Sequence, residues 1–146
     1  MPLYSQSNSK KVRERMPEQE KNVNPQKSRR GLTRILYATR YSVAGLGSAW
    51  HETAFRQEAI LAIVLTPSAL FLGTTWLERS ILIGSAIAVL VVELLNTAIE
   101  SALDRVGLEW HPLSKRAKDM GSAAVLLTLI WTAATWGSAI YSRLSL

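Results

Sequence analysis

Three long apolar segments constrain this sequence more than any other feature. They run from Ala59 to Leu77, from Ser80 to Leu103 and from Met120 to Tyr141. Each has about the 20 residues that a helix needs to cross the hydrocarbon core of a bilayer. The alternative is a soluble bundle in which all three helices are buried. A chain of 146 residues leaves too little amphipathic sequence to cover them, so the pattern favours one all-α integral membrane domain.

Residues 1–30 differ sharply in composition from the rest of the chain. They contain eight of the 17 Lys and Arg residues against three Glu residues, which is a net charge of +5 out of +6. Such a polar segment cannot bury enough apolar surface to order itself, so we expect a disordered basic cytoplasmic tail. Beside a membrane domain, we expect it to contact anionic lipid rather than nucleic acid. The sequence has no cysteine, which excludes disulfides and thiolate chemistry.

The distribution of basic residues predicts the topology. The connection after the first apolar segment offers only Arg79, and the end of the chain only Arg143. The connection after the second segment is more basic, with Arg105, Lys115, Arg116 and Lys118. The positive-inside rule therefore places the N-terminus and this second connection in the cytoplasm. The C-terminus is then expected on the periplasmic or extracytoplasmic side of the cell (inner) membrane.

The segment before the first apolar block predicts an amphipathic helix over residues 31–51. Its apolar residues recur at helical intervals, and they are Leu32, Ile35, Leu36, Val43, Leu46 and Trp50. We expect this helix to lie at the cytoplasmic interface. The membrane domain is then 31–146, with spans at about 57–77, 80–105 and 116–142, and Ser114 is the expected N-cap of the last helix.

An acidic stripe follows the second apolar segment. On a helix, Glu93, Asn96, Glu100 and Asp104 fall within about 80° of one another along about 16 Å. A structural seam of interhelical hydrogen bonds is one interpretation. Carboxylates beside hydrocarbon are costly, however, and usually have a function. Because Glu93 lies about 10 Å deeper than Glu100, it is expected at or below the level where the acyl chains begin.

Carboxylates that gather without His or Cys ligands favour a hard cation such as Mg²⁺. Lys118 is a basic residue that could meet phosphate charge nearby. Metal, cation and carboxylate base are the parts that phosphoryl transfer requires. The sequence has neither a P-loop nor the glycine-rich loop of protein kinases with its partner motifs, so a different nucleotide site is expected.

From Gly31 to about Tyr141 the chain resembles the small, three-span prokaryotic diacylglycerol kinases. The segments that carry the resemblance are Leu32–Ile35 (LTRI), Ala54–Glu58 (AFRQE), Glu93–Glu100 (ELLNTAIE) and Arg116–Ala124 (RAKDMGSAA). The resemblance implies a homotrimeric helix bundle with active sites between subunits at the cytoplasmic face. It also implies transfer of the γ-phosphate of ATP, with Mg²⁺, to diacylglycerol to give phosphatidate.

The resemblance also assigns roles to individual residues. Glu93 matches the proposed general base and Asn96 falls in the same catalytic motif, whereas Glu52 and Glu100 match metal-binding glutamates. The positions that match nucleotide contacts are Arg34, Tyr41, Glu52, Glu100, Glu109, Trp110, His111, Lys118 and Asp119. The positions that match the lipid substrate site are Arg34, Arg56, Glu58, Glu93 and Ser122.

Two alternative functions are compatible with the same sequence. The segment His111–Leu113 (HPL) is also similar to that of the related undecaprenol kinases, so the lipid acceptor could be undecaprenol. A non-enzymatic membrane subunit could instead use the acidic stripe to conduct ions or to seal an oligomer. An assay of phosphate transfer to each lipid would distinguish these alternatives.

Overall fold

The computed structural model describes residues 31–145, and within them all regular structure is helical. The expected basic tail, 1–30, lies outside the described residues. The described residues fall into two units, with the boundary between Tyr41 and Ser42. The all-α prediction is confirmed for the described part of the chain.

The predicted interfacial segment forms helix α2, Leu32–Ala49. The helix follows Gly31, whose positive φ of 68° is a backbone conformation that glycine adopts without strain. The Gly31 carbonyl accepts a hydrogen bond from the backbone N–H of Arg34 at 3.1 Å. The apolar side chains of Ile35 and Val43 are largely exposed. The helix is thus confirmed, while its place at a membrane interface stays a prediction.

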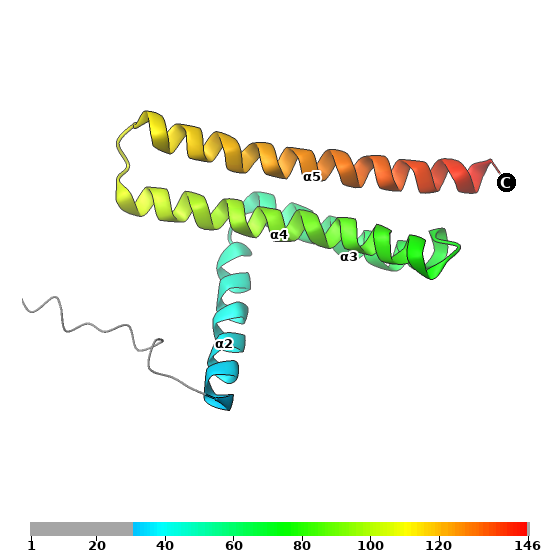
Figure 1. Cartoon of the computed structure of the whole chain (residues 1–146), viewed down its shortest axis with the longest axis horizontal. Coiled ribbons are helices and arrows are strands. Elements are labelled where there is room, and N and C mark those ends of the chain that lie inside the picture. Colours follow the sequence, from blue (N-terminus) through cyan, green and yellow to red (C-terminus); the bar gives the residue numbers. More distant parts are fainter. Residues whose placement is uncertain (1–30, 146) are drawn as a thin grey trace, which may run out of the picture. The chain divides into compact units, whose positions relative to one another are not determined.

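Three further helices are long and apolar enough to cross a membrane, as predicted. They are α3, Thr53–Leu72, α4, Trp76–Val106, and α5, Pro112–Leu144. Helix α4 packs against both of the others. Figure 1 shows α4 and α5 side by side and antiparallel, joined at one end by a short connection. Polar residues of α4 are therefore brought next to those at the start of α5.

Two interhelical hydrogen bonds fix α5 against α4. The indole Nε1–H of Trp136 donates to the carbonyl of Leu82 at 3.3 Å, and the hydroxyl of Thr132 donates to the carbonyl of Ser85 at 3.2 Å. Trp136 and Leu82 are buried together with Ala69 of α3 in one apolar cluster. Since a slip of either helix would break both bonds and the cluster, they define the register of α4 and α5.

The expected boundary between the first two spans was wrong. The sequence predicted spans ending near Leu77 and restarting at Ser80, but α3 ends at Leu72 and α4 begins at Trp76. The cause is a capping box at Thr75, whose hydroxyl accepts from the backbone N–H of Glu78 at 3.2 Å. The Glu78 carboxylate accepts in return from the backbone N–H of Thr75 at 3.3 Å. This reciprocal capping starts a helix before the apolar run resumes.

The expected N-cap of the last helix was also wrong, since α5 starts before Ser114. His111 is the N-cap residue, and its Nδ1 atom accepts a hydrogen bond from the backbone N–H of Leu113 at 3.2 Å. Pro112 follows at the first helical position, where a missing N–H costs nothing. The histidine is consequently held at the N-terminus of α5, next to the connection from α4.

Candidate active site

The acidic stripe of α4 passes from the interior of the bundle to its surface. Glu93 is 5% exposed and Asn96 is 9% exposed, whereas Glu100 is half-buried and Asp104 is exposed. The deepest members of the stripe therefore face protein and not the outer surface of the chain. A buried carboxylate and amide at this position need polar partners, since their burial is otherwise costly.

Further carboxylates, from α3 and from α4 itself, interact with Glu93. Glu52, the N-cap residue of α3, and Glu100, two turns along α4, both interact electrostatically with Glu93. Glu58 of α3 interacts electrostatically with it as well. Glu93 thus interacts with three other glutamates, and we call the four together the carboxylate cluster (Glu52, Glu58, Glu93 and Glu100). The Oε2 atom of Glu58 is buried and has no hydrogen-bond partner among the described residues.

A pocket of about 510 Å³ opens where α4 turns into α5. Five of the expected nucleotide-contacting residues line it, namely Glu109, Trp110, His111, Lys118 and Asp119. Its other lining residues are Leu103, Asp104, Gly107, Leu108, Ser114 and Lys115. Its volume falls in the range of small-molecule sites. These five residues lie around a single pocket, and their contact with a nucleotide stays a prediction.

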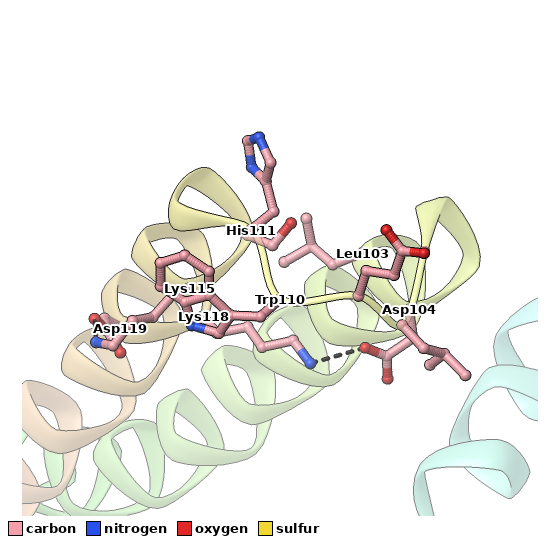
Figure 2. A pocket seen from close by; sticks show the side chains of 11 residues that line it. Leu103, Asp104, Trp110, His111, Lys115, Lys118 and Asp119 are labelled. Atoms are coloured by element: carbon pink, nitrogen blue, oxygen red, sulfur yellow. Dashed lines mark hydrogen bonds and ion pairs between the residues drawn. The ribbon is translucent and has the colours of Figure 1, made fainter.

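Two ion pairs lie at this pocket. Figure 2 shows the side chain of Lys118 reaching from α5 to Asp104 on α4, where Nζ lies 2.8 Å from Oδ1. Within α5, Lys115 pairs with Asp119 at 2.6 Å. Lys118 also interacts electrostatically with Glu100. Because Glu100 belongs to the carboxylate cluster, Lys118 connects the pocket to that cluster.

The fit of this site to a divalent cation depends on its donor atoms. Carboxylate oxygens suit Mg²⁺, which is typically held by one or two carboxylates and completes its shell with water and substrate phosphates. Within residues 31–145, no three acidic or histidine side chains gather closely enough to hold a metal ion by themselves. The chemistry of the donors therefore fits Mg²⁺ held jointly with phosphate oxygens, and does not fit an all-protein metal cage.

Four other predicted site residues are Arg34, Tyr41, Arg56 and Ser122. Arg34 and Tyr41 belong to the first unit of the chain. Arg56, near the start of α3, donates from Nη1 to the carbonyl of Trp50 at 3.4 Å. Ser122 is exposed on α5. The structure therefore leaves the predicted roles of these four residues untested.

Sequence reasoning placed Asp104 in the acidic stripe without a specific role and did not select Lys115 as a site residue, although both line the pocket. A signal for Asp104 was present, since it continues the stripe four residues after Glu100 and so lies on the same helix face. Lys115 carried no comparable signal, because its approach to the pocket depends on where α5 begins.

A family model described as prokaryotic diacylglycerol kinase matches residues 40–140. The chain belongs to this family. The matched region includes the carboxylate cluster and every residue that lines the pocket. The resemblance inferred from the sequence is thereby confirmed.

Curated members of the family are similar to the chain over most of its length. A diacylglycerol kinase of Pseudomonas aeruginosa is 50% identical over 116 residues, which cover 79% of this chain and 94% of that protein. One from Escherichia coli K12 is 47% identical over 114 residues, covering 77% and 93%. One from Haemophilus influenzae is 46% identical over 112 residues, covering 76% and 95%.

Membership in the prokaryotic diacylglycerol kinase family indicates a kinase, and the three apolar helices agree with a membrane protein. These findings favour the enzyme over the alternative of a non-enzymatic subunit. They also give the pocket and the carboxylate cluster a chemical context, namely the transfer of a phosphoryl group.

Proposed function

We propose that this protein transfers the γ-phosphate of ATP to the hydroxyl of diacylglycerol, giving phosphatidate for lipid recycling and phospholipid metabolism. The observation that carries the proposal is a buried carboxylate, Glu93, in a cluster that Lys118 links to an open pocket. The names of the relatives support the choice of substrates.

The nucleotide is proposed to occupy the pocket between α4 and α5. Lys118 supplies a positive charge for the phosphates, and His111 and Trp110 supply ring surfaces beside it. Glu109 and Asp119 are proposed as further nucleotide contacts from the pocket lining. Arg34 and Tyr41 are also proposed to contact the nucleotide, because they match positions that contact nucleotide in the family.

Glu52 and Glu100 are proposed to bind a Mg²⁺ ion that the phosphates of ATP also coordinate. Through this ion, both glutamates are also proposed to take part in nucleotide binding. When bound, Mg²⁺ neutralises negative charge on the phosphates and helps to orient them. Both glutamates interact electrostatically with Glu93, which supports a common site. Glu100 also lies within the electrostatic reach of Lys118, on the pocket side of the cluster.

Glu93 is proposed to accept the proton of the lipid hydroxyl. It lies two turns deeper along α4 than Glu100, or about 10 Å. A diacylglycerol hydroxyl resides where the acyl chains meet the headgroup layer, so its base should be deeper than the metal and the phosphates. Arg56, Glu58 and Ser122 are proposed to bind or support the lipid. Asn96, about one turn along α4 from Glu93, is proposed to support the catalytic groups.

The proposed assembly is a homotrimer in the bacterial inner membrane, with the N-terminus in the cytoplasm and the C-terminus on the other side. The described part of one chain brings fewer than three metal-ligating side chains together, which is consistent with sites completed between subunits. The basic residues of segment 1–30 and of the connection between α4 and α5 support the cytoplasmic placement of both segments. Contact of the tail with anionic lipid is proposed on its charge alone.

The decisive experiment is a transfer assay on the purified full-length protein in mixed lipid–detergent micelles. With MgATP, the protein should phosphorylate diacylglycerol at least about tenfold faster than undecaprenol, a ratio equivalent to about 1.4 kcal/mol in the barrier. Preferential transfer to undecaprenol would replace the proposed acceptor with its alternative. Transfer to neither lipid would support a non-enzymatic membrane subunit.

A further inference from the structure

Helices α4 and α5 approach closely where Asn96 meets Gly121. Gly121 is buried in α5, and a Cβ atom built on it would overlap the carboxamide of Asn96, coming within 3.3 Å of Cγ and closer still to Oδ1. Any side chain at position 121 would therefore have to displace the amide. The absence of a side chain at this residue is what allows a polar group to lie between the two helices.

The same contact determines which way the Asn96 amide faces. Its Oδ1 atom lies against Gly121, is buried, and has no hydrogen-bond partner among the described residues. Its Nδ2 atom donates to Oε1 of Glu100 at 3.2 Å. Rotating the amide by half a turn would put two acceptor oxygens next to each other, because an ionised carboxylate can only accept. The carboxylate of Glu100 therefore fixes the amide orientation.

We propose that Asn96 is a positioning residue that acts through Glu100, and that Gly121 is the residue of α5 that makes this possible. This inference rests on the proposed role of Glu100 in binding the metal. Residues that hydrogen-bond a metal ligand fix its orientation, and their removal typically weakens metal binding about 10- to 100-fold. Glu100 is the more exposed residue of the pair, so it is the one that an entering metal ion reaches first.

The structure offers a matched set of variants to test this inference. Asn96→Ala removes the donor to Glu100, and Gly121→Ala pushes against the amide from the opposite side. Gly137→Ala is the control, because a Cβ atom at Gly137 of the same helix meets no atom within 4 Å. In the double variant Asn96→Ala/Gly121→Ala, the added methyl group enters the space that the carboxamide vacated, so the packing of α4 on α5 is preserved.

The readout is Mn²⁺ binding, measured by electron paramagnetic resonance on the full-length protein in micelles with a non-hydrolysable ATP analogue. We expect the dissociation constant to rise about 10- to 100-fold in Asn96→Ala. It should rise in Gly121→Ala as well, and stay unchanged in Gly137→Ala. The double variant should match Asn96→Ala within about twofold, because Gly121 serves only to accommodate the amide.

Three results would overturn the inference while leaving the proposed function intact. The first is wild-type Mn²⁺ affinity in Asn96→Ala, and the second is Gly121→Ala behaving like Gly137→Ala. A double variant that binds far more weakly than Asn96→Ala would show that Gly121 has a separate role, which contradicts the second half of the proposal. If the wild-type protein itself binds no Mn²⁺ with the nucleotide analogue, the role of Glu100 fails, and the inference fails with it.

Discussion

The ammonium group of Lys118 lies 2.8 Å from the carboxylate of Asp104, and this ion pair joins α5 to α4 at the pocket. The side chains are 42% and 53% exposed, so water screens the interaction and its effect on stability is small. Its consequence is geometric, since the charge of Lys118 is held between Asp104 and the carboxylate cluster. A phosphate entering the pocket would meet a lysine that is already oriented.

Lys118→Ala should raise the KM for ATP at least about tenfold, because a charge-assisted hydrogen bond to phosphate is lost. Asp104→Asn should change this KM by no more than about fivefold, because an exposed ion pair contributes little. Steady-state kinetics with ATP as the varied substrate measures both. If Asp104→Asn proved as damaging as Lys118→Ala, Asp104 would have to contact the nucleotide or its metal directly.

Glu93→Gln should lower kcat by about 10²- to 10⁴-fold, the usual contribution of a general base. The KM for ATP should change little, since Glu93 lies deeper than the pocket. The matched control is Glu78→Gln in the same helix, because glutamine can also complete a capping box. Phosphate transfer to diacylglycerol is the measurement. Retention of most of the activity in Glu93→Gln would show that another group accepts the proton.

Glu100→Gln should raise the Mg²⁺ concentration needed for half-maximal activity at least about tenfold, because an amide oxygen is a weaker ligand for a hard cation than a carboxylate. The maximal rate should fall as well. Titrating the rate with Mg²⁺ at fixed ATP tests this, with Glu93→Gln as a variant that is slow but has an unchanged Mg²⁺ requirement. An unchanged requirement in Glu100→Gln would remove it from the metal site.

Trp136→Phe should destabilise the packing of α5 on α4 by about 0.5–1.5 kcal/mol, because the hydrogen bond from Nε1 to Leu82 is lost. Trp131→Phe is the control, since Trp131 is 50% exposed in the same helix. Unfolding in graded mixtures of denaturing and mild detergent, followed by near-ultraviolet circular dichroism, measures the difference. Equal losses in the two variants would mean that this hydrogen bond does not contribute to stability.

The sequence predicted the helices and the acidic stripe because both depend on local periodicity. A run of apolar residues and a set of carboxylates at intervals of three and four define a helix face without tertiary information. The end of α3 and the start of α5 were harder to predict from the sequence. The Thr75–Glu78 capping box was readable in the sequence, but the apolar residues that follow it made the helix start look like the end of the preceding span.

The site itself could be predicted only in part, because it depends on how helices meet. Glu52 and Glu58 approach Glu93 through the packing of α3 on α4, which no spacing in the sequence specifies. The position of Lys118 opposite Asp104 likewise requires the register of α5 on α4. The family resemblance supplied five of the eleven pocket residues, and the acidic stripe already contained Asp104. The contact of Gly121 with Asn96 emerged only from the structure.

Within residues 31–145, little of the apolar surface of helix α5 is covered by the rest of the chain. Of its most apolar 18 residues 11% are buried, compared with 28% for α4. Lipid acyl chains or other copies of the chain must therefore cover most of the apolar surface of α5. We expect the choice of detergent to affect α5 before α4. Harsh extraction should then loosen the part of the pocket that α5 and Lys118 form, while the glutamates of α4 stay in place.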